Sequence, residues 1–260
     1  MSTSDNSLTG IKRSRVAVLS SKSFAMNDYL AIELSHNFDV DLLIVSKTFT
    51  QEIKYIKKVW AKTRFLGFFY YMWQKLKEHL YLRKFVKEEF QPGRTKVSKF
   101  EFKENSERLC VHLREIGYDF ILLGKSGLLD KRILQSGTFK FVNVHPAKLP
   151  EFRGYAEPAH ALLMDRNSDV GFSIHWVDEG IDTGRIIEWI PLKYGEMANL
   201  TELLAWVRFQ GFKHFLKNTN KSQIFFREHT KSRPSFPIST FLNWKIRRRL
   251  DISFRRINFS

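Results

Sequence analysis

The sequence predicts an α/β protein in which helices cover both faces of a Rossmann-like, mostly parallel sheet. Short apolar runs typical of strands alternate with segments whose apolar residues recur at helical spacing. One of these runs, residues 119–124, is apolar almost throughout, as expected of a strand that is buried on both faces. A basic helical insertion and a short C-terminal extension complete the predicted architecture.

The first elements form a unit of strand, helix and strand. After a polar leader at residues 1–14, which we expect to be disordered, strands are predicted at 15–20 and 41–46 with a helix at 29–35 between them. The turn at residues 20–24 has no glycine. A glycine-rich phosphate loop is therefore not expected, which argues against a nicotinamide enzyme and against a P-loop NTPase.

Residues 51–93 differ in composition from the rest of the chain. They are rich in lysine and aromatic residues, and they predict one or two basic helices that end before Pro92. We favour an insertion that packs on its own domain or forms a dimer contact. The alternative is an element that binds a membrane surface or nucleic acid.

The remaining segments continue the alternation of strands and helices. Strands are expected at residues 95–102, 119–124, 139–144, 171–177 and 185–191, the last two forming a hairpin. Helices are expected at residues 105–116, 132–135 and 197–216, before a basic tail.

Composition limits the class of protein. The 43 lysines and arginines exceed the 27 acidic residues and give a net charge of +16, which favours nucleic acid, an anionic membrane face or phosphorylated small molecules. The single cysteine, Cys110, excludes an internal disulfide and reads as a small buried apolar residue. Since we find neither a signal-peptide pattern nor an uncharged apolar run of ~18 residues, we expect a cytoplasmic protein.

Polar side chains that could perform chemistry gather in residues 141–187. Asn143 and His145 are two residues apart at a strand end and should project to one side, while Asp182 lies in the hairpin loop. A histidine with a carboxylate partner can act as acid or base near neutral pH, and an asparagine can donate to a developing oxyanion. Without an obvious nucleophile elbow, this set suits direct transfer of an acyl group to an amine.

Two motifs sharpen this interpretation. Residues 143–154 read N-x-H-P-x-x-L-P-x-x-R-G and residues 171–184 read G-x-S-x-H-x-x-D-E-x-x-D-T-G, and together they resemble the folate-dependent formyltransferase family. That family includes glycinamide ribonucleotide transformylase, methionyl-tRNA formyltransferase and the sugar N-formyltransferases. The resemblance implies an enzyme with a catalytic domain at 15–195, which carries the insertion 51–93, followed by a C-terminal helix and basic tail at 196–260.

The resemblance also implies roles for individual residues. Asn143 would bind the oxyanion, His145 would take up or relay the amine proton, and Asp182 would orient His145 and help place a water. The pterin of the co-substrate N10-formyltetrahydrofolate would lie between two loops, whose residues are Lys125, Ser126, Gly127, Leu128, Leu129, Asp178, Glu179, Gly180 and Ile181. The amine acceptor would lie beside Pro150, Arg153 and Gly154. No metal site is expected.

Some of these positions have a plainer interpretation. Arg153 and Gly154 could form a structural turn with a solvated arginine, in which backbone geometry requires the glycine. His175 is interpreted as a hydrogen-bonded core histidine rather than an acid or base. His160 and Glu157 are expected on a helix after the turn, without an assigned role.

The acceptor stays open between several amines. We favour a nucleotide-linked amino sugar, because the compact core with a short extension is similar to sugar N-formyltransferases and a diphosphate suits a basic protein. The glycinamide ribonucleotide enzymes have a glycine-rich loop that residues 20–24 do not match. Methionyl-tRNA enzymes carry a C-terminal β-barrel for which we expect too few residues after 216, although the positive charge would suit tRNA. A homodimer, a peripheral membrane contact through 51–93, and a non-catalytic protein that binds nucleic acid or membrane are the further alternatives.

Overall fold

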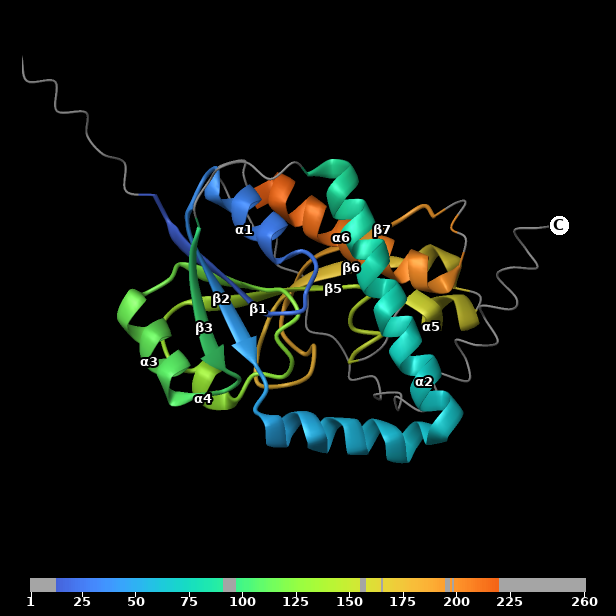
Figure 1. Cartoon of the computed structure of the whole chain (residues 1–260). Coiled ribbons are helices and arrows are strands. Elements are labelled where there is room, and N and C mark those ends of the chain that lie inside the picture. The colour runs from blue at the N-terminus through green and yellow to red at the C-terminus, as the bar shows by residue number, and fades with distance from the viewer. Residues whose placement is uncertain are drawn as a thin grey trace, which may run out of the picture.

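The computed structural model describes residues 13–90, 97–154, 158–164, 166–194, 197 and 199–219. Its strands form one seven-stranded sheet in the order β3-β2-β1-β4-β5-β6-β7 (Figure 1). The strands are β1 (Arg15–Ser21), β2 (Asp39–Ser46), β3 (Ser98–Lys103), β4 (Phe120–Leu123), β5 (Lys140–His145), β6 (Gly171–Trp176) and β7 (Ile186–Pro191). In this order, neighbouring strands from β3 through β2, β1 and β4 to β5 pair in parallel. Strand β6 pairs antiparallel with β5 and with β7, and β6 and β7 form the expected hairpin. The predicted mostly parallel sheet is confirmed.

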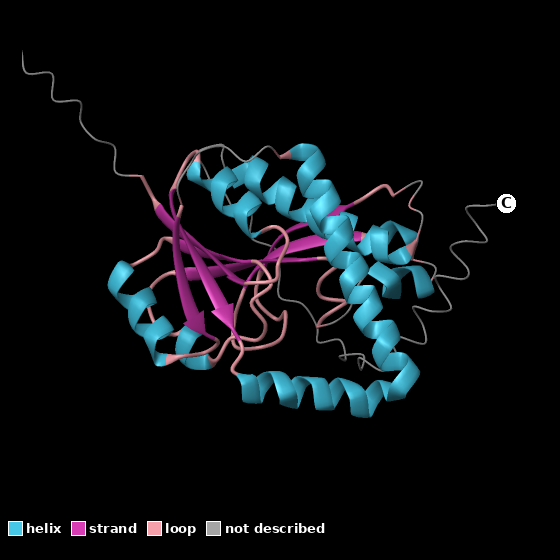
Figure 2. Ribbon diagram, viewed as in Figure 1, coloured by secondary structure: helices cyan, strands magenta, loops and turns pink. Residues whose placement is uncertain are grey.

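Helices cover both faces of this sheet (Figure 2). Helices α1, α2 and α6 contribute to the core on one face, and α3 and α4 to the core on the other. The helices are α1 (Asn27–Ser35), α2 (Phe49–Glu89), α3 (Glu107–Ile116), α4 (Lys131–Leu134), α5 (Pro158–Leu163) and α6 (Leu200–Thr219), with a 3-10 turn η1 (Asn167–Asp169). None of the helices in these described ranges is long and apolar enough to cross a bilayer.

Strand β1 shows why the apolar runs form the centre of the sheet. Val16 and Val18 join the core on the α6 side, whereas Ala17 and Leu19 join the core on the α3 side. Successive side chains of a strand point to opposite faces, so a strand that is covered twice must be apolar at every position. All four of these side chains are fully buried.

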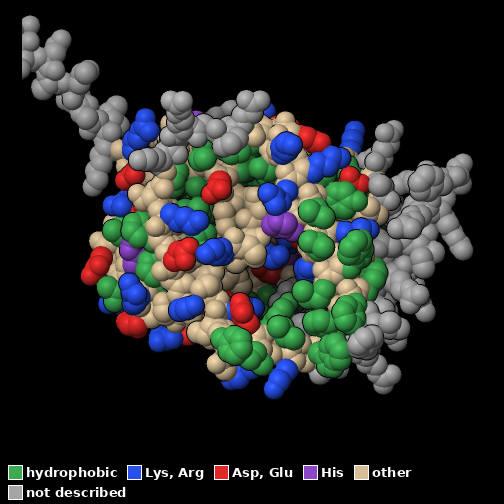
Figure 3. Space-filling model, in the orientation of Figure 1, with side chains coloured by type: hydrophobic (Ala, Val, Ile, Leu, Met, Phe, Trp, Pro, Cys, Tyr) green, Lys and Arg blue, Asp and Glu red, His purple; other side chains and the backbone are tan. Residues whose placement is uncertain are grey.

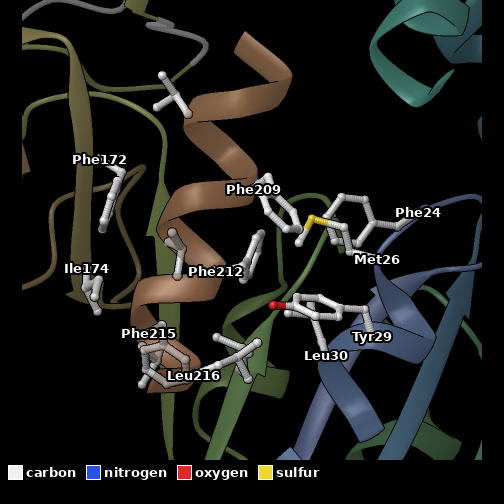
Figure 4. Close-up of a cluster of buried hydrophobic side chains, with 14 of the residues drawn as sticks. Phe24, Met26, Tyr29, Leu30, Phe172, Ile174, Phe209, Phe212, Phe215 and Leu216 are labelled. Carbon is white, nitrogen blue, oxygen red and sulfur yellow. The ribbon is translucent and has the colours of Figure 1, made fainter. Parts of the chain in front are cut away.

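Helix α6 fixes the strands that carry the later part of the sequence. Its phenylalanines, among them Phe209, Phe212 and Phe215, lie between α1 and the β6 side chain of Phe172 (Figure 4). A Cβ on Gly211 would lie 2.6 Å from a methyl group of Val144. The helix therefore approaches β5 as closely as a glycine allows, and this contact holds the carboxyl end of β5 in place.

Helix α2 is the predicted basic insertion, and it is a single bent helix. Thr48 caps its first turn together with Gln51. The hydroxyl groups of Tyr55 and Tyr71 lie 2.5 Å apart although the residues are 16 positions apart, which would be about 24 Å along a straight helix. Figure 1 shows the two arms, which we define as residues 49–60 and 68–89. The second arm packs on α6, so the expectation of packing on the chain's own domain holds for that arm.

The remaining predicted elements are present with small shifts of their ends. The strand expected at 95–102 is β3 from Ser98, and the helix expected at 105–116 begins at Glu107 because Ser106 caps it. The leader and the basic tail fall mainly on residues 1–12 and 220–260, which lie outside the described ranges.

Candidate active site

The site lies where the order of the strands reverses. The chain adds β2 and β3 on one side of β1 and then β4 to β7 on the other, so the carboxyl ends of β1 and β4 form the switch point at which α/β sheets bind ligands. The Ser20 hydroxyl accepts the Lys125 N–H at 3.0 Å, and the Ser21 N–H donates to the Lys125 carbonyl at 3.0 Å. These bonds fix the loop after β4 against the end of β1.

Asn143 and His175 face each other across the β5–β6 pair. The His175 Nδ1 lies 2.8 Å from the carbonyl of Trp176, so this nitrogen carries the proton. The His175 Nε2 then accepts from the amide of Asn143 at 3.0 Å. Burial, only partly offset by Asp182, lowers the pKa of His175 to about 4, so this ring is neutral at physiological pH.

His145 is buried at the end of β5. Its Nε2 donates to the Phe152 carbonyl at 2.8 Å, so the neutral ring presents the unprotonated Nδ1 to Asp182. The distance from Nδ1 to the Asp182 carboxylate is 3.6 Å. This is longer than a direct hydrogen bond, and His145 can take up a proton at Nδ1 with a carboxylate beside it.

Asp182 lies between the two imidazole rings. One oxygen accepts the Gly154 N–H at 2.7 Å, and the other lies 3.6 Å from the Nε2 of His175. Its side chain is 15% exposed, and its backbone φ of 50° is in the left-handed region that Asp tolerates better than most residues. The structure therefore brings the three predicted catalytic residues, Asn143, His145 and Asp182, into one cluster.

The loop predicted to hold the pterin follows β4. The Asn105 side chain donates to the Leu128 carbonyl at 3.2 Å and accepts the Asp130 N–H at 2.8 Å, which fixes residues 125–129. Gly127 has a φ of 78°, and a Cβ there would lie 2.5 Å from the Glu104 carboxylate. Ser126 is buried, Leu129 is half-buried, and Leu128 is 66% exposed, so the loop offers backbone groups and one apolar side chain to a ligand.

The second loop predicted to hold the pterin, residues 178–181, is stabilised by the carboxylates of Asp178 and Glu179. Asp178 accepts the N–H of Gly180 at 3.1 Å and the hydroxyl of Thr183. Glu179 pairs with Lys131 of α4 at 3.1 Å. Both acidic groups therefore bond within the chain, and a ligand at this loop would meet its backbone and Ile181, which is 49% exposed.

The turn predicted beside the acceptor is more buried than expected. Gly154 has a φ of 74°, which confirms that backbone geometry requires a glycine there. Arg153 is only 9% exposed, so the alternative of a solvated arginine is wrong. The Phe152 carbonyl bonds His145 and the Gly154 N–H bonds Asp182, so the turn is held between the end of β5 and the hairpin loop. His160 lies on α5 and is buried, whereas Glu157 lies outside the described residues.

Three features of the site were missed from the sequence. The Phe152 carbonyl sets the tautomer of His145, and His175 contacts both Asn143 and Asp182. Ser173, fully buried, bonds the backbone of residues 147 and 149 at 2.9 Å each. The sequence does carry a signal for Ser173 and His175. They lie two positions apart in an apolar strand, so they must share one face and need hydrogen-bond partners there.

Comparisons with known proteins identify the family of this chain. A family model described as formyl transferase matches residues 82–216, just over half of the chain. The chain belongs to the formyl transferase family. The matched residues include β4 to β7 and therefore every residue of the Asn143, His145 and Asp182 cluster.

Members of the family with different names match this chain in part. The methionyl-tRNA formyltransferase of Finegoldia magna is 35% identical over 100 residues, which cover 38% of this chain and 32% of that protein. The chloroplastic phosphoribosylglycinamide formyltransferase of Arabidopsis thaliana is 38% identical over 80 residues, which cover 29% of this chain and 27% of that protein. The chain spans about a third or less of the length of the curated relatives it matches.

A solved structure shares the fold over most of the chain. The X-ray structure of a sugar N-formyltransferase from a Shewanella species superposes with a TM-score of 0.53 and 14% sequence identity. The superposition covers 86% of this chain and 75% of that one. At this identity, the likeness establishes the fold of the formyl transferase domain.

Proposed function

We propose that this chain transfers a formyl group from N10-formyltetrahydrofolate to a primary amine, and that the amine belongs to a nucleotide-linked amino sugar. The observation that carries the proposal is the cluster of His145, which is buried, with the partly buried Asp182 and Asn143 at the carboxyl end of β5. It combines a base, a carboxylate that stabilises the protonated base, and an amide donor, which is the set that formyl transfer without a covalent enzyme intermediate requires.

Each residue has one task in this reaction. The amine nitrogen attacks the formyl carbon, and the carbon–oxygen double bond opens to an oxyanion. Asn143 keeps one N–H on His175 and donates its second N–H to that oxyanion. The Nδ1 of His145 accepts the amine proton, Asp182 stabilises the resulting imidazolium, and His145 returns the proton to the folate nitrogen as the carbon–nitrogen bond to folate breaks.

The two loops beside the cluster fit the pterin of the co-substrate. Leu128 and Ile181 expose apolar side chains on the two loops, and a flat ring that covers them would remove this surface from water. Pterin edges offer amide-like donors and acceptors, which the backbone of residues 125–129 and 178–181 can meet. Residues 125–129 and 178–181 would therefore hold the ring, and Pro150, Arg153 and Gly154 would border the acceptor.

Positive charge beside the switch point supports an acceptor with phosphates. Arg208 and Lys75 flank the buried Glu78, and the charges of all three act on Lys125. Loss of water around its ammonium, followed by repulsion from Lys75, lowers the pKa of Lys125 to about 8. Three cations around one carboxylate leave a positive charge that suits a diphosphate.

Methionyl-tRNA is the second candidate acceptor. Two observations favour it: the curated methionyl-tRNA formyltransferases among the relatives, and the net charge of +16, which suits a nucleic acid. The two candidates differ in the size of the acceptor, so they are distinguished directly by turnover.

The test is a panel of amines. The purified full chain is incubated with N10-formyltetrahydrofolate and with nucleotide-linked amino sugars, methionyl-tRNA or glycinamide ribonucleotide, and the products are examined by mass spectrometry for an added formyl group. We expect formylation of a sugar nucleotide, and its near loss in His145→Ala at an unchanged thermal midpoint. Formylation of methionyl-tRNA alone would select the second candidate.

The same panel tests the activity itself against a protein of another class. A protein that only binds would retain tRNA in an electrophoretic assay, in a salt-dependent manner, without formylating any amine. Near-normal turnover of His145→Ala would also contradict the proposed roles, because the base would then lie elsewhere.

A further inference from the structure

The second arm of α2 carries an apolar stripe that faces solvent. Its residues recur at i, i+3, i+4, i+7 and i+11, the spacing with which a helix buries one face. Each of these side chains is nevertheless 49–55% exposed, and together they form what we call the α2 stripe: Phe69, Met72, Trp73, Leu76 and Leu80. The opposite side of the arm already packs on α6, where Gln74 bonds Thr201 and Glu78 pairs with Arg208.

The first arm also exposes apolar side chains. Phe49, Ile56 and Trp60 follow the same helical spacing and are also exposed. Figure 3 shows hydrophobic side chains gathered over α2 at the lower right of the view, with lysines and arginines at their margin. An exposed apolar surface beside the core of the described residues points to an interaction site.

The charge of the same stretch indicates what would cover the stripe. Residues 49–80 hold seven lysines and arginines against two glutamates: Lys54, Lys57, Lys58, Lys62, Arg64, Lys75 and Lys77 against Glu52 and Glu78. The ammonium of Lys77 lies 5.8 Å from the Trp73 ring, and that of Lys47 lies 4.2 Å from the Tyr55 ring. Lysines that lie along aromatic rings at the edge of an apolar face are typical of helices that bind at a lipid interface.

Two other occupants fit the charge less well. In a symmetric dimer this surface would lie against its own copy, so like charges would face each other. The C-terminal tail, residues 220–260, holds ten lysines and arginines against two acidic residues and would repel the same surface. Nucleic acid has the right charge, and the rings of Phe69 and Trp73 could stack on bases. The aliphatic side chains of Met72, Leu76 and Leu80 lie between and beyond these rings and have no base to stack on, which favours a lipid surface.

We propose that α2 docks this protein on an anionic lipid bilayer, with the α2 stripe in the interface and the lysines on the headgroups. The docking is peripheral and separate from formyl transfer, because no residue of the stripe belongs to the Asn143, His145 and Asp182 cluster. The same helix supplies Lys75 and Glu78, whose charges act on Lys125 in the loop after β4. Because this loop borders the proposed active site, docking through α2 would hold the site close to the membrane surface.

The test is sedimentation of the full chain with unilamellar vesicles. We expect binding to vesicles of mixed phosphatidylglycerol and phosphatidylcholine, little binding to phosphatidylcholine alone, and a decrease with added salt. Met72→Ser should weaken binding about threefold to tenfold, the scale of re-exposing half of a methionine side chain. Met164→Ser is the matched control, because Met164 has a similar exposure outside the stripe and should bind as the wild type does.

Four outcomes would overturn the proposal. They are no binding to anionic vesicles, equal binding of the Met72→Ser and Met164→Ser variants, a dimer by light scattering that Met72→Ser dissociates, or RNA binding that needs Met72 while vesicles do not bind. Formyl transfer to a soluble amine in Met72→Ser serves as the folding control. If this variant loses both formyl transfer and vesicle binding, its thermal midpoint is compared with that of the wild type. A lowered midpoint indicates misfolding, and Leu76→Ser then takes its place, whereas an unchanged midpoint would contradict the separation of docking from formyl transfer.

Discussion

Replacing Asp182 by asparagine isolates the charge of the proposed active site from its shape. An asparagine can still accept the Gly154 N–H, and it tolerates the left-handed φ of 50° at this position. The fold should therefore remain, with a thermal midpoint within about 3 °C of the wild type, since about 1 kcal/mol shifts the midpoint of a large domain by only a few degrees. The negative charge beside His145 is the only feature removed.

The expected loss of formyl transfer in Asp182→Asn follows from the distance between the Asp182 carboxylate and the His145 Nδ1. A carboxylate 3.6 Å from the His145 Nδ1 stabilises the imidazolium by about 4–5 kcal/mol at an effective dielectric constant of about 20. The 15% exposure of Asp182 admits some water, so this is an upper value. We therefore expect kcat for formyl transfer to fall by about 10²–10³-fold, because about 1.4 kcal/mol corresponds to a factor of ten in rate.

The control is Asp39→Asn at the exposed start of β2. Asp39 is 63% exposed and pairs with Arg15 rather than with an imidazole, so its amide variant should retain formyl transfer within about threefold. Rates are measured under saturating N10-formyltetrahydrofolate with the acceptor found in the panel. If Asp182→Asn kept a rate close to that of the wild type, or if both variants lost the same factor, the assigned role of the Asp182 charge would be wrong.

Three further predictions concern stability and geometry. Glu78→Gln should lower the free energy of unfolding by about 3–5 kcal/mol in urea, because it leaves the guanidinium from α6 without its buried partner; the exposed Glu88→Gln should change it by less than about 0.5 kcal/mol, and equal midpoints would refute the argument. His175 has a folded-state pKa of about 4, below its unfolded value, so its contribution to stability is complete above pH ~6.5 and is lost as the pH falls toward 4, by at most about 1.4 kcal/mol per pH unit; His175→Gln should flatten this dependence in urea titrations at pH 7 and 5, and an unchanged slope would contradict it. Gly154→Ala should cost about 1–2 kcal/mol at its φ of 74° and reduce formyl transfer by moving the N–H that holds Asp182, so a fully active, equally stable variant would disprove this role.

The sequence predicted those elements whose signal is local. The apolar run at 119–124 became β4, and the hairpin ends at 171–177 and 185–191 were off by one residue. Strands covered on both faces leave no polar positions, so their composition alone identifies them. The structure also brings the motif residues Asn143, His145 and Asp182 together. Asn143 and His145 lie on one side of β5 as their spacing predicts, whereas β6 is antiparallel to β5, so the hairpin loop has to fold back to place Asp182 beside them.

What the sequence did not predict depends on contacts between distant residues. The bond between Asn143 and His175 follows from the β5–β6 register, and the pairing of Glu78 with Arg208 joins residues 130 positions apart. The bend of α2 brings Tyr55 to Tyr71, yet the composition around Gly67 reads equally well as two helices. The burial of Arg153 likewise arises from how the turn packs against the hairpin, which no local pattern records.

The residues of the proposed reaction centre come from one continuous part of the chain, between the loop after β4 and the hairpin loop that carries Asp182. The elements before Phe120, including α2, supply neighbours and surfaces but none of the three groups that act on the formyl carbon. The reacting groups therefore occupy a compact block of the sequence, whereas the proposed docking surface lies in the first half of the chain. Substitutions on the α2 stripe would change where the protein docks and leave the three reacting groups in place.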